Sequence, residues 1–223
     1  MKIELKKRII TSIFLSTLLI LMSSYNYVLI VSLIIIGIIA WIEFYALISK
    51  IFKKRNYNNV ALRFILKATS LLYLSFVIFI IILSKLNFPD LYALIIYIIM
   101  ISIMTDIGGL IVGKFFKGKK LTKISPNKTI SGSIGSFVFS LFLIPFFLNF
   151  LSLYVNIPLF NVILITLSIS LISQLGDLFI SFIKRKAKVK NTSDLLPGHG
   201  GILDRIDGII FATPLGILLF NLF

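Results

Sequence analysis

Polar side chains recur at helical spacing in one apolar run of this 223-residue chain. The run extends over residues 168–185, and four of its polar residues stand at steps of three, four and three: Gln174, Asp177, Ser181 and Lys184. Such steps place all four side chains on one face of a helix. Two more carboxylates, Asp204 and Asp207, stand three positions apart where the next apolar run begins.

A glycine-rich loop with the only histidine, Leu196-Pro-Gly-His199-Gly-Gly, lies between these two groups. Glycines allow a backbone to approach a ligand closely. Asp177 and Asp204 belong to different predicted helices that the loop joins, so the two carboxylates can converge. Two converging carboxylates can hold Mg²⁺ against phosphate oxygens. We therefore predict a functional site at this loop and the two carboxylates.

Cationic side chains surround this region and suit a phosphoryl group, since they can neutralise charge during its transfer. They are Lys184, Arg185, Lys190 and Arg205. A second basic loop, residues 114–129, combines lysines with Ser125, Asn127 and Thr129, a composition suited to phosphate oxygens. A plain basic loop explains the lysines equally well. The residues favour metal-dependent phosphoryl or nucleotidyl transfer at a cytoplasmic membrane face, with a lipid as the plausible acceptor.

Composition indicates an all-α, polytopic integral membrane helix bundle. The chain is 58% hydrophobic and 14% charged, whereas soluble domains have about 25% charged residues. Several apolar runs approach the roughly 20 residues that cross a bilayer. The absence of cysteine excludes disulfides and thiolate ligands, and a single histidine excludes a histidine-rich zinc site. Any metal must be bound by oxygen, which favours Mg²⁺.

Seven apolar runs are predicted to span the membrane: residues 9–22, 28–49, 68–83, 91–113, 132–150, 159–183 and 208–223, the last interrupted at Pro214. With a cytoplasmic N-terminus, every Lys and Arg except Lys85 falls on the cytoplasmic side, as the positive-inside rule requires. The formal net charge of +15 is explained by such loops and by anionic headgroups or a phosphate-rich substrate, not by nucleic acid. We expect one membrane domain, residues 1–223, with N-terminal helices in 1–90 and catalytic helices and cytoplasmic loops in 91–223.

Three acids lie inside apolar runs: Glu43, Asp106 and Asp177. A charge at the centre of a membrane helix costs about 2.5–3.5 kcal/mol, so each needs a partner or a polar cavity. For Glu43, structural pairing, for example with a lysine at a helix end, and a functional role both stay open. Near Asp106, the pair Gly109 and Gly113 predicts close approach of another helix.

The second half of the chain, roughly residues 100–223, resembles the phosphatidate cytidylyltransferases, the CDP-diacylglycerol synthases. The resemblance rests on several segments: Asp106-x-Gly-Gly, Gly113-Lys114, Ser125-Pro-Asn-Lys128-Thr129, Gln174-Leu-Gly-Asp177, Ser181-Phe-Ile-Lys184-Arg185, Lys190, and Leu196-Pro-Gly-His199-Gly-Gly-Ile-Leu-Asp204-Arg205-Ile-Asp207. In the first half, Trp41-Ile-Glu43 is similar to an aromatic-acidic segment of that family.

The resemblance implies that CTP and phosphatidate give CDP-diacylglycerol and diphosphate, with Mg²⁺, at the cytoplasmic face of a bacterial-type inner membrane. It implies metal binding by Asp177 and Asp204, while Asp207 supports that site or binds a second, monovalent or divalent, cation. The implied catalytic residues are Asp177, Lys184, Asp204 and Asp207, and the substrate-binding residues are Ser125, Lys128, Ser181, Arg185, Lys190, His199 and Arg205. His199 binds a substrate, relays a proton or shapes the loop. Small-residue stripes and the family together suggest a homodimer.

Two departures and two alternative functions stand beside this interpretation. Asn191 and Ser131 occupy positions where the family usually has acids. A CTP-dependent polyprenol or phytol kinase would release CDP instead, although the Pro-Gly-His-Gly-Gly segment argues against it. A small ion-coupled transporter would show repeat symmetry and functional acids near the midplane, whereas these polar residues gather beside basic loops.

Overall fold

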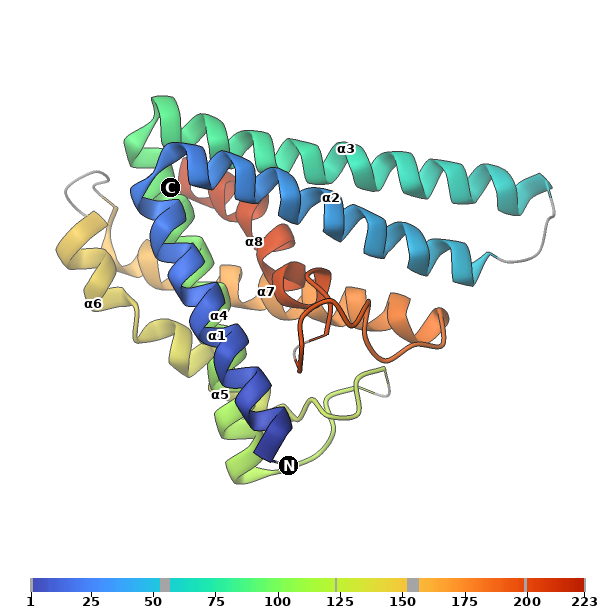
Figure 1. The fold of residues 1–223 in the computed structure, drawn as a ribbon. Coiled ribbons are helices and arrows are strands. Elements are labelled where there is room, and N and C mark those ends of the chain that lie inside the picture. The colour runs from blue at the N-terminus through green and yellow to red at the C-terminus, as the bar shows by residue number, and fades with distance from the viewer. Residues whose placement is uncertain (1, 53–56, 123, 152–156, 199, 223) are drawn as a thin grey trace. The chain divides into compact units, whose positions relative to one another are not determined.

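In the computed structural model, which describes residues 2–52, 57–122, 124–151, 157–198 and 200–222, all regular elements are helical (Figure 1). The only β pairing in this part of the chain consists of two isolated bridges, Lys120 with Thr129 and Leu196 with Gly200. The predicted all-α class is confirmed.

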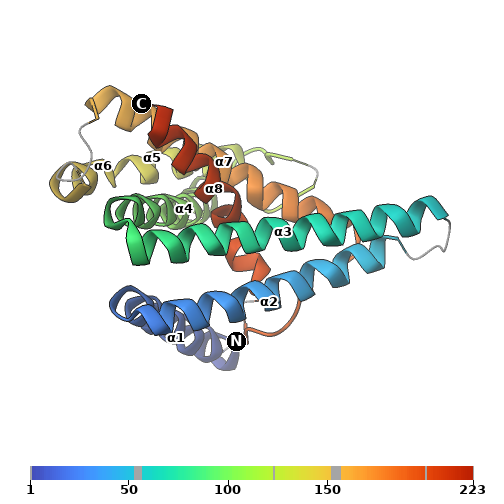
Figure 2. The same cartoon turned by 90° about the horizontal axis from the view of Figure 1, so that it is seen from above.

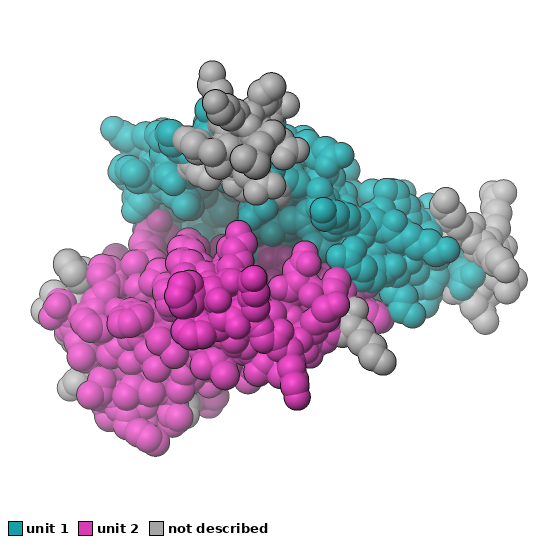
Figure 3. Space-filling model, turned by 90° about the horizontal axis from the view of Figure 1, so that it is seen from below, with its two compact units in different colours: residues 1–86, 183–206 teal, residues 87–182, 207–223 magenta. Residues whose placement is uncertain are grey.

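The chain divides into two compact units, coloured separately in Figure 3. Unit 1 comprises residues 1–86 and 183–206, and unit 2 comprises residues 87–182 and 207–223. Each unit is built from its own internal contacts, and the two are therefore described one after the other.

Unit 1 contains three long helices: α1 (Lys2–Ser24), α2 (Asn26–Ile51) and α3 (Tyr57–Asn87). Helices α2 and α3 lie side by side in opposite directions (Figures 1 and 2). Trp41 Nε1 of α2 donates to the Lys67 carbonyl of α3 at 3.2 Å. Lys67 is buried, and its ammonium donates to Ser49 Oγ at 2.7 Å and lies 3.1 Å from the Tyr45 ring centroid. The hydroxyl and the ring face compensate a cation that would otherwise be costly to bury.

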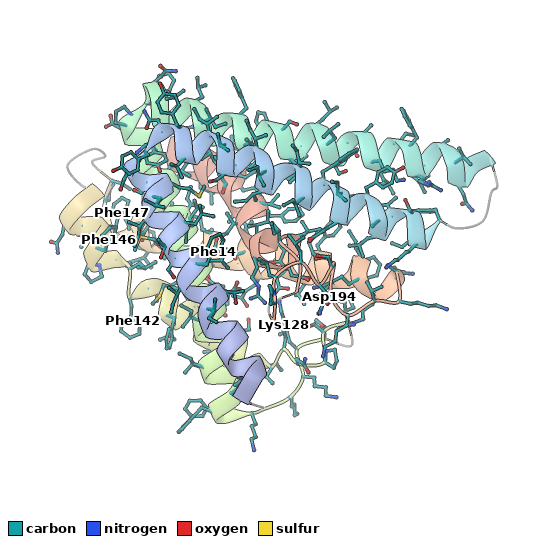
Figure 4. All side chains as sticks on the ribbon, viewed as in Figure 1. Phe14, Lys128, Phe142, Phe146, Phe147 and Asp194 are labelled. Carbon is teal, nitrogen blue, oxygen red and sulfur yellow. The ribbon has the colours of Figure 1, made fainter. Side chains whose placement is uncertain are left out.

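Unit 2 contains the remaining elements: α4 (Pro89–Phe116), α5 (Ile130–Leu141), α6 (Ile144–Phe146), the π-helix η1 (Phe147–Leu151), α7 (Leu159–Lys186) and α8 (Leu203–Leu222). The last turn of α7 and the first turn of α8 belong to unit 1. The core of unit 2 is apolar and centres on fully buried Tyr97 and on Phe147, which is labelled in Figure 4. The Tyr97 hydroxyl is paired with Thr166 Oγ1 at 2.8 Å, so this buried polar group is satisfied.

Glycines bring α4 and α5 into backbone contact. A Cβ added to Gly109 would lie 2.7 Å from Ser136 Oγ, and one added to Gly113 would lie 3.4 Å from the Gly132 Cα. A Cβ added to Gly132 would lie 2.8 Å from the Gly109 carbonyl oxygen. The close approach predicted from Gly109 and Gly113 is confirmed, and α5 is the helix that approaches.

Among the described residues, five helical segments are long and apolar enough to cross a membrane: Asn26–Ile51, Asn59–Asn87, Pro89–Phe116, Ile130–Asn149 and Leu159–Lys186. A shorter apolar stretch covers Ile13–Ser24, and α8 contains Pro214. The chain is thus a multi-pass membrane bundle, and the count of seven stays a prediction. The span expected over residues 132–150 changes helix type on the way, because α5 ends at Leu141 and Pro145 starts a new turn.

Substituting Gly132 by alanine should destabilise the chain by about 1–3 kcal/mol, because the new methyl group meets a rigid backbone carbonyl. Gly37→Ala is the matched control, since its methyl group meets only the side-chain tip of Ile78, which can rotate. The gain in helix propensity, about 0.5–1 kcal/mol in a helix interior, applies to Gly37 in the middle of α2 more than to Gly132 in the first turn of α5. Denaturant unfolding in detergent measures the difference, and equal midpoints for the two variants would contradict this account.

Candidate functional site

A buried ion pair joins the end of α7 to the start of α8 in unit 1. Lys184 Nζ lies 2.5 Å from Asp204 Oδ1, and the two side chains are only 11% and 9% exposed. The positions are twenty apart in the sequence, yet the intervening loop returns the chain to the same place. Two of the four predicted catalytic residues are therefore in direct contact.

Backbone donors of the loop saturate the other Asp204 oxygen. Oδ2 accepts from the Thr192 N–H at 2.9 Å and from the Gly201 N–H at 3.1 Å. Burial opposes ionisation of Asp204, but the hydrogen bonds from Lys184 and from these two N–H groups hold its pKa below the usual carboxyl value. Because the folded chain lowers the pKa of Asp204, ionisation of Asp204 stabilises the fold. This stabilisation is present above the usual carboxyl pKa and is lost as the pH falls through the lowered pKa of Asp204.

A second carboxylate, Glu43 of α2, holds the same loop. The side chain is buried, and its Oε1 accepts from Ser193 Oγ at 2.5 Å and from the Ile202 N–H at 3.1 Å. Its Oε2 accepts from Thr192 Oγ1 and from the Leu203 N–H, each at 2.8 Å. Ile202 and Leu203 lie at the N-terminus of α8, where unpaired N–H groups favour a negative charge. The partner of Glu43 is thus a loop and a helix end, and the lysine offered as an example in the sequence analysis is not its partner among the described residues.

The Thr192 hydroxyl lies between the two carboxylates. Its oxygen is 2.8 Å from Glu43 Oε2 and 3.0 Å from Asp204 Oδ2. A hydroxyl has a single proton, so it can donate to only one carboxylate at a time. The space around it is full, because a Cβ on Gly201 would overlap the hydroxyl and lie 2.6 Å from Glu43 Oε1. Gly200, at φ +84°, adopts a backbone conformation that favours glycine.

Unit 2 contains a second lysine–carboxylate pair, between Lys128 and Asp177. This pair is more open, since each side chain is 26% exposed. Ser181 Oγ donates to Asp177 Oδ1 at 3.3 Å, so these two residues share a face of α7 as their spacing predicted. Figure 4 labels Lys128, which lies on the loop before α5.

The loop that presents Lys128 is ordered by its own hydrogen bonds. The Lys128 N–H donates to the Ser125 carbonyl at 3.1 Å, which closes a turn around Pro126 and Asn127. The Lys128 carbonyl accepts from the Leu121 N–H at 2.8 Å. Thr129 caps α5 by accepting from the Gly132 N–H at 3.0 Å. The segment predicted to bind phosphate therefore forms a hydrogen-bonded turn, to which Ser125 contributes its backbone carbonyl.

The other predicted residues are distributed as follows. Asp207 is buried in α8, where its Oδ1 accepts from the Gly208 N–H at 2.9 Å. Arg185 is exposed and donates to the Val189 carbonyl at 3.2 Å, and Lys190 and Arg205 are exposed. His199 lies outside the described residues. Asp177 and Asp204 fall in different units, so their convergence on one cation stays a prediction.

The carboxylate oxygens of Asp177 and Asp204 are ligands that suit a hard cation. Within the described part of the chain, no group of three or more acidic or histidine side chains forms a ready metal cage. Each of the two carboxylates is neutralised by a lysine instead. The residues fit Mg²⁺ on the condition that a lysine ammonium gives up its carboxylate oxygen.

Comparison with known proteins now decides the family. The model of the cytidylyltransferase family matches residues 2–223. The chain belongs to the cytidylyltransferase family. A protein of Bacillus subtilis named phosphatidate cytidylyltransferase is 45% identical over 120 residues, which cover 53% of this chain and 44% of that protein. Proteins of the same name are 42% identical over 126 residues in Staphylococcus haemolyticus and 43% over 122 in Staphylococcus aureus, each match covering 54% of this chain and 46% of the relative. The chain thus spans about half the length of the curated relatives it matches.

Sequence reasoning missed Thr192 and Ser193, and it left the role of Glu43 open. The one available signal was Glu43 itself, a carboxylate in an apolar run that required polar partners. The two residues that depart from the family pattern, Ser131 and Asn191, make local contacts. Ser131 Oγ lies 3.0 Å from Thr129 Oγ1 beside the α5 cap, and Asn191 packs against Gly200.

The two lysine–carboxylate pairs should differ in their contribution to stability. Lys184→Met leaves a buried carboxylate without its cation, so we expect a loss of about 3–5 kcal/mol. Lys128→Met makes the same chemical change at the more open pair and should cost about 1 kcal/mol or less. Unfolding of both variants in detergent tests this, and a loss at Lys128 equal to that at Lys184 would contradict the assigned burial.

Proposed function

We propose that this chain is a phosphatidate cytidylyltransferase: it transfers the cytidylyl group of CTP to phosphatidate and releases diphosphate. Membership of the cytidylyltransferase family together with the buried Lys184–Asp204 pair is the observation that supports the proposal. Relatives of that name share 42–45% identity with about half of this chain. We place the reaction at the cytoplasmic face of a bacterial cell membrane, where the basic loops would lie.

Positive side chains would bind the phosphates. Lys128 and Lys184 already stand against carboxylates, so each can turn to a phosphate oxygen while its carboxylate takes another cation. Arg185, Lys190 and Arg205 are exposed and lie on or next to the loop between α7 and α8. These groups would orient the triphosphate so that a phosphatidate oxygen attacks the α-phosphorus, forming a P–O bond as the bond to diphosphate breaks. Phosphatidate is already ionised near neutral pH, so this step needs no strong base.

Mg²⁺ would be held by Asp177 and Asp204, with Asp207 supporting that site or a second cation. When bound, it supplies neutralisation of the charge that develops on the phosphate oxygens. The contribution of the chain itself is to keep Asp204 ionised, because hydrogen bonds from Lys184 and from two backbone N–H groups hold the pKa of this carboxyl below its usual value.

Asp177→Asn and Asp204→Asn should each abolish transfer of labelled CTP into lipid, because a neutral amide does not supply the negative charge that balances the cation. Asp90→Asn is the matched control, since Asp90 is an exposed acid in the first turn of α4. Purified protein is given labelled CTP, phosphatidate and Mg²⁺, with membrane insertion checked separately.

The released product distinguishes the candidate reactions. Diphosphate supports the cytidylyltransferase, CDP indicates a CTP-dependent lipid kinase, and neither product is the outcome that an ion-coupled transporter would give. Turnover near the wild-type level in either aspartate variant would refute the metal ligands proposed here.

A further inference from the structure

We propose that Glu43 is a positioning residue for the transfer reaction, because it holds the loop of residues 192–203 against α2 and thereby fixes Asp204 and Lys184. The proposal rests on the function proposed above. Glu43 lies in the N-terminal half of the chain, far in sequence from the other proposed site residues, and it makes its contacts across 149–160 positions.

The contacts form a continuous chain from α2 to Asp204. Glu43 binds the Thr192 hydroxyl and the Leu203 N–H through one oxygen. Thr192 in turn gives its N–H to Asp204 Oδ2, whose other oxygen pairs with Lys184. Displacement of the loop from Glu43 would therefore shift the donors that orient Asp204. Such supporting contacts determine whether a site holds its working geometry.

Helix α2, which carries Glu43, is itself held by a contact with α3. Two positions earlier on α2, Trp41 Nε1 donates to the Lys67 carbonyl of α3 at 3.2 Å. Trp41 and Glu43 point to different partners, one to α3 and the other to the loop. Helix α2 is thus bonded both to α3 and to the loop, so the loop is held by a pair of helices.

The donor pattern requires a carboxylate at this position. Each Glu43 oxygen accepts from one hydroxyl and one backbone N–H: Ser193 and Ile202 at Oε1, Thr192 and Leu203 at Oε2. In Glu43→Gln, either orientation of the amide turns an NH₂ group toward one of the two backbone N–H groups. A hydroxyl can rotate and accept, but a backbone N–H cannot. Glutamine therefore releases the loop at Ile202 or at Leu203 although it has the same size.

The test compares Glu43→Gln with Asp194→Asn, which removes the same charge from an exposed residue of the same loop, labelled in Figure 4. Amide hydrogen exchange of Ile202 and Leu203 reports whether the loop is held. Turnover of CTP per folded molecule reports whether this matters for the reaction. For Glu43→Gln we expect faster exchange at Ile202 or Leu203 and a kcat lowered about 10-fold or more, and for Asp194→Asn neither change.

Two results would overturn the proposal: exchange that becomes faster while kcat stays within about twofold, or a kcat that falls while exchange is unchanged. If Glu43→Gln does not fold, Thr192 replaces it as the test, because valine keeps its size without the hydroxyl. Loss of kcat in Thr192→Val with recovery in Thr192→Ser supports the proposal, and equal activity of the two overturns it. If the wild-type chain releases no diphosphate, the proposed function fails separately, and unchanged exchange in Glu43→Gln would still overturn the positioning role.

Discussion

A carboxylate that is buried inside a protein must be supplied with hydrogen-bond donors, and this requirement organises unit 1. Glu43 and Asp204 together receive hydrogen bonds from loop hydroxyls, from backbone N–H groups and from one lysine. If one of these donors moved away, a buried negative charge would lose its hydrogen-bond partner, which costs free energy. The loop between α7 and α8 is consequently folded around its acids. Gly201 is required because a Cβ there would overlap the Thr192 hydroxyl, and Gly200 because its φ of +84° favours glycine.

Local features of the sequence predicted much of the fold. Apolar runs of about membrane length indicated the helices, and the step of four between Gly109 and Gly113 indicated the contact that α5 makes. The same kind of reasoning placed Asp177 and Ser181 on one face of α7. It did not show the interruption near Leu141, because a proline inside an apolar run is compatible with a kink, a break or a continuous span.

The site was predictable only where its residues are close in the sequence or have strong chemical character. Asp204 and Lys184 met the second condition, and the structure brings them together although they are twenty positions apart. Thr192 and Ser193 met neither, since a loop hydroxyl carries no periodic signal and its partner Glu43 is 149 or more positions away. An acid inside an apolar run indicates that hydrogen-bond donors must surround it. Composition and spacing do not show which distant segment provides those donors.

The two lysine–carboxylate pairs give the candidate site an asymmetry that follows from exposure alone. At Asp177 both partners are partly open to solvent, so water and salt already compete for the ion pair. At Asp204 the lysine and the carboxylate are nearly enclosed, and two backbone N–H groups fix the other oxygen. A competing cation or phosphate therefore meets less resistance at Asp177 than at Asp204. Exchange of partners should begin at the open pair and reach the closed pair, which the loop on Glu43 holds, only afterwards.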